Sequence, residues 1–327
     1  MAKFKVLLFE SIHQKGVDHL QENDAEIVYA PGFAPEQICS VVGDVDGILA
    51  RAQGRIDGAV MDYAPALKVV GRHGIGVDNI DVAAAEERGI FVVNTPRAPA
   101  EAVAEYVAMA MVALPRGMVQ LDTATRTGDW GARNRIHGPE LLGKTLGIVG
   151  FGRIGRRIAE ICGLGFGMRI LYADAVFAPP EEEARLKARR VSLEDLLATS
   201  DFVSLNVPLL DSTHHLIDAE ALARMQPQAY LVNCSRGPVV DEPALIDALK
   251  NNRIAGAVID VYEQEPIAPD NPLLSMHNVM LSPHCSGHSV ESAQNMAMVA
   301  ADIIRVLKGQ KPEFPVNGPK TPRQPVS

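Results

Sequence analysis

The chain contains 327 residues, of which 47% are hydrophobic and 22% are charged, a composition typical of a soluble globular protein with room for two domains. The formal net charge is −9 and no basic run is present, so the electrostatic signature of a nucleic-acid-binding protein is missing. The four cysteines form neither a C-x-x-C pair nor a metal-ligand pattern. An N-terminal apolar run is too short for a signal-peptide core. We therefore expect a cytoplasmic protein with reduced thiols, no metal, and no nucleic-acid or membrane partner.

The first hundred residues alternate between short apolar strands and helical patterns. Strands are predicted at 6–9, 27–29, 47–50, 68–71 and 91–93, and helices at 12–21 and 81–88. Alternation of strand and helix is typical of a parallel sheet, so this part of the chain is predicted to form an α/β domain of its own.

Residues 102–114 predict a helix that is apolar on almost every face and is interrupted only by Glu105. The segment is shorter than the roughly 18–20 residues that a membrane-spanning helix needs. A helix that is apolar all round must be covered all round, so we expect it at a domain or subunit interface.

A glycine-rich turn follows the apolar strand at 145–149 and opens a helix. Gly150 would make the tight turn, Gly152 would let the backbone approach a pyrophosphate, and Gly155 would let the helix lie close to the strand. Arg153 and Ile154 complete the pattern at the helix N-terminus, where unpaired N–H groups favour an anion. The sequence therefore predicts a dinucleotide site, although an unrelated glycine-rich turn is the alternative for this motif alone.

Asp174 distinguishes between the possible dinucleotides. It comes nineteen residues after Gly155, behind a second predicted strand at 168–172, where a carboxylate accepts the ribose hydroxyls. An acid there repels a 2′-phosphate, and Arg189 and Arg190 are expected to lie beyond the following loop. NAD is therefore predicted rather than NADP.

Further strands at 202–206, 230–233, 256–261 and 279–281 complete a predicted doubly wound sheet of six or seven strands. An amphipathic helix at 290–307 is expected to pack back on the first domain, which makes that domain discontinuous. The proline-rich tail from residue 310 is expected to be extended or disordered.

Three side chains that could carry chemistry follow the last strands. Arg236, Glu265 and His284 come after the strands at 230–233, 256–261 and 279–281. Ligands of open α/β sheets bind beyond the carboxyl ends of the strands, so an arginine, an acid and a histidine are expected to converge there. Taken singly, each could instead be a surface, ion-pair or turn residue.

The segments around these residues resemble the signatures of the D-isomer-specific 2-hydroxyacid dehydrogenases. The resemblance is carried by residues 71–81, 233–241, 260–266 and 282–284, extends from about residue 5 to residue 317, and is strongest to short-type D-3-phosphoglycerate dehydrogenases without a regulatory domain. It implies an α/β protein with two doubly wound parallel-sheet domains and a homodimer. A Rossmann NAD domain at 99–289 would be inserted into a flavodoxin-like substrate domain at 1–98 and 290–327, with disorder from about residue 318.

The resemblance also implies a role for each site residue. His284 would be the general acid/base, Glu265 would fix its tautomer, and Arg236 would hold the substrate carboxylate and polarise the 2-carbonyl. Asp260 would face the nicotinamide carboxamide. The other cofactor contacts implied are Val207, Pro208, Thr213, Cys234 and Ser235, and the other substrate contacts are Arg51, His73, Gly74, Ile75 and Gly76.

Two segments depart from the common family pattern, at Ala98-Pro99 and at residues 285–288. The predicted substrate is therefore a small anionic 2-hydroxy or 2-oxo acid, either 3-phosphoglycerate or another acid with a second anionic group. A phosphonate- or phosphite-type dehydrogenase and an NAD-responsive, corepressor-like scaffold are the alternatives that share the same motifs.

Overall fold

The computed structural model describes residues 3–323 of the chain, which divide into two compact units. Unit 1 is formed by the residues up to 99 together with those from 288 onward, and unit 2 by residues 100–287. Each unit contains one sheet in which every strand pair is parallel. The alternation of strands and helices in the sequence thus produces two α/β units, each built on one parallel sheet, as predicted.

The sheet of unit 1 has five strands in the order β2-β1-β3-β4-β5. The strands are β1 (Phe4–Leu8), β2 (Ala25–Tyr29), β3 (Gly47–Ala50), β4 (Val69–Arg72) and β5 (Phe91–Asn94). This order is that of flavodoxin-like folds, in which helices cover both faces of the sheet. Two buried clusters, one on each face, account for the continuous apolar runs of the strands.

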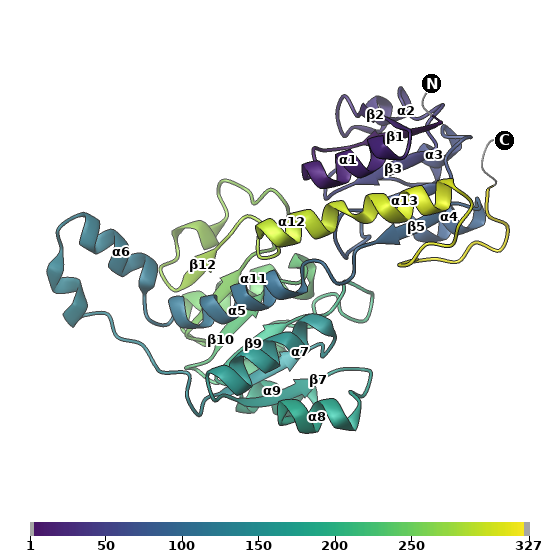
Figure 1. The fold of residues 1–327 in the computed structure, drawn as a ribbon. Coiled ribbons are helices and arrows are strands. Elements are labelled where there is room, and N and C mark those ends of the chain that lie inside the picture. The colour runs from purple at the N-terminus through teal and green to yellow at the C-terminus, as the bar shows by residue number, and fades with distance from the viewer. Residues whose placement is uncertain (1–2, 324–327) are drawn as a thin grey trace. The chain divides into compact units, whose positions relative to one another are not determined.

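The helices of unit 1 are α1 (Gln14–Glu22), α2 (Pro35–Cys39), α3 (Gly58–Asp62), α4 (Val82–Glu87), α12 (Val290–Ala297) and α13 (Val299–Leu307). α13 lies against the sheet, as Figure 1 shows in yellow, and buries Ile303. A Cβ built on Gly71 would come within 2.6 Å of the Ile303 side chain, so the glycine permits this close packing. The single helix predicted at 290–307 is divided at Met298, whose N–H caps α12.

The sheet of unit 2 has seven strands in the order β12-β11-β10-β9-β6-β7-β8. The strands are β6 (Thr145–Val149), β7 (Arg169–Ala173), β8 (Ala188–Arg190), β9 (Phe202–Leu205), β10 (Tyr230–Asn233), β11 (Gly256–Ile259) and β12 (Val279–Leu281). From β6, successive strands are added outward to β7 and β8 on one side, whereas β9 to β12 are added on the other side. The point between β6 and β9 is therefore the topological switch point of a Rossmann fold, where such sheets bind dinucleotides.

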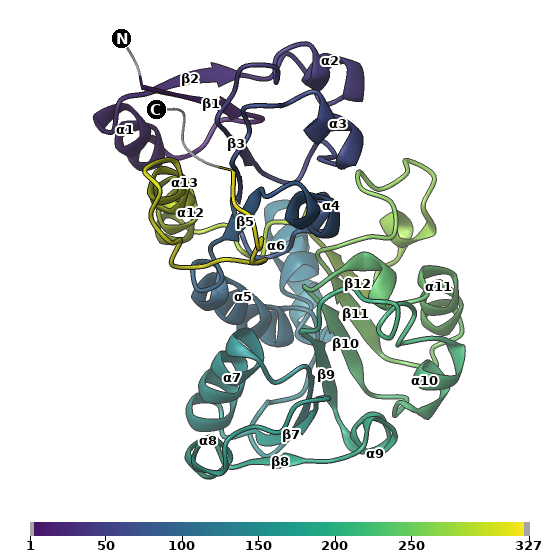
Figure 2. The ribbon, with the colours of Figure 1, turned by 90° about the vertical axis from the view of Figure 1, so that its right-hand side faces the viewer.

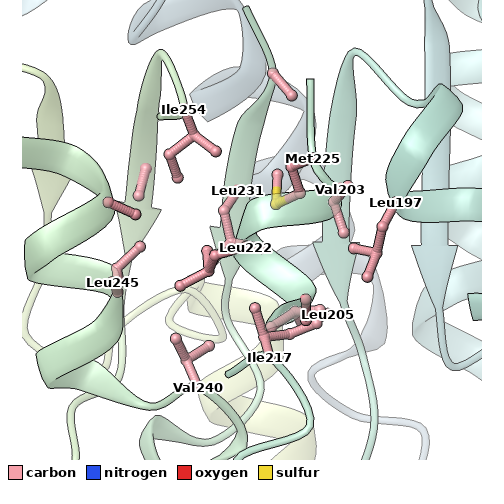
Figure 3. Close-up of a cluster of buried hydrophobic side chains, with 14 of the residues drawn as sticks. Leu197, Val203, Leu205, Ile217, Leu222, Met225, Leu231, Val240, Leu245 and Ile254 are labelled. Atoms are coloured by element: carbon pink, nitrogen blue, oxygen red, sulfur yellow. The ribbon is translucent and has the colours of Figure 1, made fainter. Parts of the chain in front are cut away.

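Helices cover both faces of this sheet (Figure 2). One face carries α5 (Ala100–Ala113), α7 (Arg153–Ala159) and α8 (Pro180–Leu186), and the other carries α9 (Leu193–Thr199), α10 (Ala219–Arg224) and α11 (Glu242–Lys250). Figure 3 shows the core on the second face, where Leu222 and Leu245 from the helices meet Leu231 from the sheet. The remaining elements are α6 (Met118–Arg126), the short 3-10 helices Trp130–Asn134, Gly237–Val239 and Pro272–Ser275, and a π-helical turn at Glu160–Gly165.

The apolar helix predicted at 102–114 corresponds to α5. Ala104, Val107 and Met111 are buried in the core of unit 2, where α5 packs on α7, while Met109 is 44% exposed. Within residues 3–323, no single helix is long and apolar enough to cross a bilayer, and the pair α5 and α6, which together have the length and composition, is bent by 66°. A role for α5 at an interface stays a prediction.

The C-terminal segment differs from the expectation of disorder beyond residue 318. Backbone hydrogen bonds join Phe314 and Val316 to β5. The Asn317 side chain accepts a hydrogen bond from the Val92 N–H at 2.8 Å and donates one to the Ile90 carbonyl at 3.0 Å. Arg323 donates to the backbone carbonyls of four residues, Ala64, Pro65, Leu67 and Arg88. The prolines keep the segment extended, and the open edge of β5 supplies its partners. The expected disorder at 324–327 lies outside the described residues.

Replacement of Asn317 tests this attachment. Asn317→Ala is expected to destabilise unit 1 by about 1–3 kcal/mol, because it leaves a buried N–H and a buried carbonyl without their side-chain partner. The measurement is the midpoint of thermal or urea unfolding. Lys320→Ala, an exposed position in the same segment, is the control, and equal midpoints for the two variants would contradict the prediction.

Candidate active site

The glycine turn of unit 2 has the shape that a dinucleotide requires. Gly150 has φ +89°, and a Cβ there would lie 2.5 Å from the Asn206 carbonyl, so a side chain is excluded. A Cβ on Gly155 would lie 2.2 Å from the Gly150 carbonyl, whereas one on Gly152 would meet nothing within 4 Å. The turn is therefore tight at its first and third glycines and open at the second, where a pyrophosphate would approach. Arg153 and Ile154 begin α7, as predicted.

Asp174 stands directly after β7, beside this turn. Its carboxylate accepts hydrogen bonds from the N–H groups of Phe151 at 2.6 Å and Val176 at 2.8 Å. These bonds place the acid at the switch point of the sheet, and a carboxylate has further lone pairs for ribose hydroxyls. The geometry of the turn and of Asp174 fits NAD.

Arg190 was expected to lie beyond the loop that follows Asp174, but the structure places it next to that residue. β8 pairs with β7, and Arg190 donates to the Asp174 carbonyl at 2.7 Å while its guanidinium stacks 3.7 Å from the centre of the Phe177 ring. No sequence pattern indicated β8, because three residues are too few to show a period.

The other predicted cofactor residues lie after β9 and β10. The Thr213 hydroxyl donates to the Pro208 carbonyl at 2.7 Å and accepts from the Leu210 N–H at 2.8 Å, which closes the turn 208–213 directly after Val207. Cys234 and Ser235 follow β10 directly, and burial raises the pKa of the Cys234 thiol. Both loops therefore leave the same carboxyl edge of the sheet as the glycine turn, on the opposite side of the switch point.

Glu265 and His284 form a hydrogen-bonded pair. Nδ1 of His284 lies 2.8 Å from Oε2 of Glu265, and the Tyr262 N–H donates to the other carboxylate oxygen at 3.1 Å. The imidazole is 43% exposed, so Nε2 can reach a ligand. Because Nδ1 is bonded to the acid, the histidine is held in the tautomer and orientation that a general acid/base needs.

The pKa of Glu265 reflects the same contacts. Burial raises the pKa of this carboxyl, but the hydrogen bond and the charge of His284 oppose burial. The Tyr262 N–H and the charge of Arg236 lower the pKa further, and the net pKa lies below the usual value. Glu265 is therefore ionised at neutral pH and can stabilise a protonated imidazole.

Arg236 reaches this pair through a tightly packed turn. Asn233, which is buried, donates to the Arg236 carbonyl at 2.9 Å and accepts from Ser235, so its amide shapes the turn after β10. A Cβ on Gly237 would lie 1.8 Å from the Tyr262 carbonyl. The turn therefore packs directly on the loop that carries Glu265, and no side chain fits at Gly237. Unit 2 thus brings together the three predicted catalytic residues.

Asp260 directly follows β11 and lies in a buried hydrogen-bond network. It is completely buried, and its carboxylate accepts hydrogen bonds from Ser282, Cys285 and Ser286. These partners occupy both oxygens, and a contact with the nicotinamide carboxamide stays a prediction.

The predicted substrate residues of unit 1 follow the adjacent strands β3 and β4. Arg51 comes after β3 and donates to the Ser11 carbonyl at 3.1 Å, and His73 comes after β4 and is buried. Burial lowers the pKa of His73 to about 3, and the charges of Arg51 and Arg72 add to this effect. His73 is therefore neutral at pH 7 between two permanent cations.

The loop from His73 to Gly76 offers fewer backbone donors than the sequence suggests. The N–H of Gly74, which has φ +124°, is bonded to the Thr95 hydroxyl at 3.1 Å, and the Ile75 carbonyl accepts from Asn94 at 2.7 Å. Arg72 donates to the Gly76 carbonyl at 2.6 Å. The N–H groups of Ile75 and Gly76 are the remaining candidates for an anion. Arg72, Asn94 and Thr95 were not singled out in the sequence, since their contacts depend on the pairing of β4 with β5.

Three comparisons with known proteins agree with this geometry. Residues 108–286 match the family model described as D-isomer specific 2-hydroxyacid dehydrogenase, NAD binding domain. A glyoxylate reductase of Thermofilum pendens is 41% identical, over 97% of this chain and 95% of its own. A D-3-phosphoglycerate dehydrogenase of Methanocaldococcus jannaschii is 40% identical, over 98% of this chain and 60% of its own. The crystal structure of holo D-mandelate dehydrogenase from Rhodotorula graminis superposes with a TM-score of 0.89 at 30% identity, over 99% of this chain and 100% of its own.

The match of the family model covers more than half of the chain, and the relatives match it almost from end to end. The glycine turn with Asp174 and the switch point of the seven-stranded sheet are the features by which such a sheet binds a dinucleotide. The chain therefore belongs to the D-isomer specific 2-hydroxyacid dehydrogenase family and is an NAD-dependent oxidoreductase.

Proposed function

We propose that the enzyme interconverts a D-2-hydroxy acid and its 2-oxo acid, with proton transfer through His284. The observation that carries this proposal is the hydrogen bond of 2.8 Å between Nδ1 of His284 and Oε2 of Glu265. The imidazole is also 43% exposed. Such a pair presents Nε2 to an alcohol or carbonyl oxygen, which is what alcohol oxidation by a nicotinamide enzyme demands of the protein.

The residues of unit 2 have separate roles in this reaction. The glycine turn and Asp174 would hold NAD, which would supply the hydride acceptor for oxidation at C2 and, as NADH, the hydride donor for the reverse reaction. His284 takes the hydroxyl proton at Nε2 in oxidation and gives it back in reduction, while Glu265 stabilises the protonated imidazole. Arg236 holds the carboxylate with its planar guanidinium and draws charge toward the 2-oxygen.

We further propose that the substrate carries a second anionic group and that Arg51 binds it. The support is the density of positive charge at the ends of β3 and β4, where Arg51 and Arg72 lie around a neutral His73. 3-Phosphoglycerate is one acid of this class.

A phosphonate- or phosphite-type substrate would use the same cations. Oxidation assays that compare 3-phosphoglycerate with phosphonate and phosphite substrates distinguish these two substrate classes. A corepressor-like scaffold would bind NADH without turning over any 2-oxo acid.

We also propose that the enzyme is a homodimer. Met118, Val119 and Trp130, in α6 and the turn after it, are each at least 50% exposed. An apolar cavity of about 550 Å³ lies between α6 and β12. Exposed apolar groups gathered in this way are typical of a protein interface.

His284→Ala tests the assignment of the acid/base. The variant is expected to lose about 10²- to 10⁴-fold in kcat, because proton transfer to the substrate oxygen is lost. Its affinity for NADH, measured by fluorescence titration, is expected to stay within a factor of about 2, since the glycine turn is unchanged. His137→Ala, an exposed histidine of the same unit, is the control. Turnover of the His284→Ala variant at the rate of the control would remove the assignment.

Arg51→Ala tests the second anionic group. KM for 3-phosphohydroxypyruvate is expected to rise about 10- to 100-fold, because a hydrogen bond to a charged group is lost, while KM for glyoxylate stays within about threefold. Steady-state NADH oxidation with the two acids measures both. The control is Arg55→Ala, whose side chain is 80% exposed and lies 3.9 Å from Asp57. An equal rise for both acids would contradict the role given to Arg51.

Val119→Asp tests the dimer. Light scattering after size-exclusion chromatography is expected to give twice the chain mass for the wild type and the mass of one chain for the variant, because a charge in an apolar interface is costly. Leu164→Asp, at an exposed apolar position elsewhere in unit 2, is expected to keep the wild-type mass. A monomeric wild type at micromolar concentration would refute the proposal.

A further inference from the structure

The carboxylate of Asp260 is the centre of a buried hydrogen-bond network in unit 2. It is fully buried at the carboxyl end of β11, and it accepts from the Ser282 hydroxyl at 2.6 Å, the Cys285 N–H at 2.8 Å and the Ser286 N–H at 2.9 Å. A buried charge is tolerated only where donors compensate it. All three donors belong to residues 282–286, the segment that carries His284.

The backbone of His284 needs this support. Its φ is +51°, a left-handed conformation that residues with a Cβ disfavour. The His284 N–H donates to the Asp260 carbonyl at 2.8 Å. Asp260 therefore holds His284 directly through its carbonyl, and through its carboxylate it holds the residues before and after His284. Such conformations persist where surrounding contacts over-determine them, as they do here.

Tyr106 extends the network to α5. Its hydroxyl donates to the Ser282 hydroxyl at 2.6 Å, which in turn donates to Asp260, so that one chain of bonds links the helix to the carboxylate. Burial raises the pKa of Tyr106 to about 12, and the tyrosine therefore keeps its proton at neutral pH. The Ser282 carbonyl is held separately by the Tyr262 hydroxyl at 3.0 Å.

We propose that Tyr106 and Ser282 are positioning residues of the dehydrogenase reaction, which act through Asp260 to keep the His284 imidazole on Glu265. The proposal rests on the role given above to His284 as acid/base. Neither residue touches the reacting atoms. Loss of either hydroxyl loosens the segment 282–286 and misplaces the imidazole, and a misplacement of about 1 Å at a reacting group can cost about 100-fold in rate.

The test uses the full-length enzyme with Tyr106→Phe, Ser282→Ala and the double variant. Each single variant is expected to lower kcat about tenfold and to leave NADH affinity within about twofold. The double variant is expected to be no slower than the slower single variant, because both changes break the same chain of bonds. Tyr230→Phe removes a hydroxyl at the amino end of β10, far along the strands from the catalytic edge, and is the matched control.

Rescue by a conservative variant supplies a readout that a merely structural role would not move. Ser282→Thr keeps the hydroxyl that bonds Asp260, so its kcat is expected to stay within about threefold of the wild type while that of Ser282→Ala falls about tenfold. The kcat of Tyr230→Phe is expected to equal that of the wild type. Thermal midpoints and NADH titrations establish that each variant is folded.

Three results would overturn the proposal: wild-type kcat in both single variants, rate losses that multiply in the double variant, or a Ser282→Thr variant as slow as Ser282→Ala. Failure of the proposed function is distinguishable from these, since it would show as undiminished turnover in His284→Ala whatever the network variants do.

Discussion

The hydrogen bond between His284 and Glu265 is the interaction on which the proposed proton transfer in unit 2 depends. It can form because β11 and β12 are parallel and paired, so the loops that follow them leave the same edge of the sheet side by side. Arg236 joins them from β10, which pairs with β11 on its other side. The turn after Arg236 packs so closely on the loop of Glu265 that Gly237 admits no side chain. Sheet geometry thus brings three residues distant in sequence into one site.

The parts of this site that were predictable from the sequence are those with a local physical cause. The three glycines of the NAD turn each have their own steric requirement, and the structure meets all three requirements. Asp174, Arg236 and His284 directly follow strands or their short loops, so that alternation of strand and helix was sufficient to place them at one edge. The same alternation predicted a sheet of six or seven strands and a separate α/β domain, whereas the flavodoxin-like arrangement of that domain was implied by the family resemblance.

The parts that could not be predicted depend on contacts between distant residues. Tyr106 meets Ser282 across 176 positions of sequence, and nothing in the pattern of α5, which reads as an apolar helix, distinguishes this tyrosine from its neighbours. Arg190 reaches Asp174 through a three-residue edge strand, and Asn317 pairs with β5 across 225 positions. Proline content alone suggested disorder in the C-terminal segment. The open edge of a sheet, which no local pattern reveals, supplies the partners that hold it.

The two curated relatives show that overall similarity does not assign the substrate. A glyoxylate reductase and a D-3-phosphoglycerate dehydrogenase are 41% and 40% identical to this chain over nearly its whole length. Glyoxylate has nothing beyond its carboxylate and carbonyl, whereas phosphoglycerate adds a phosphate that the protein must either contact or leave in water. A hydrogen bond to a charged group changes affinity by about one to two orders of magnitude. One or two cations would therefore be enough to change the substrate without any change in the proposed catalytic trio, and our proposal assigns this part in the present chain to Arg51, at the end of β3.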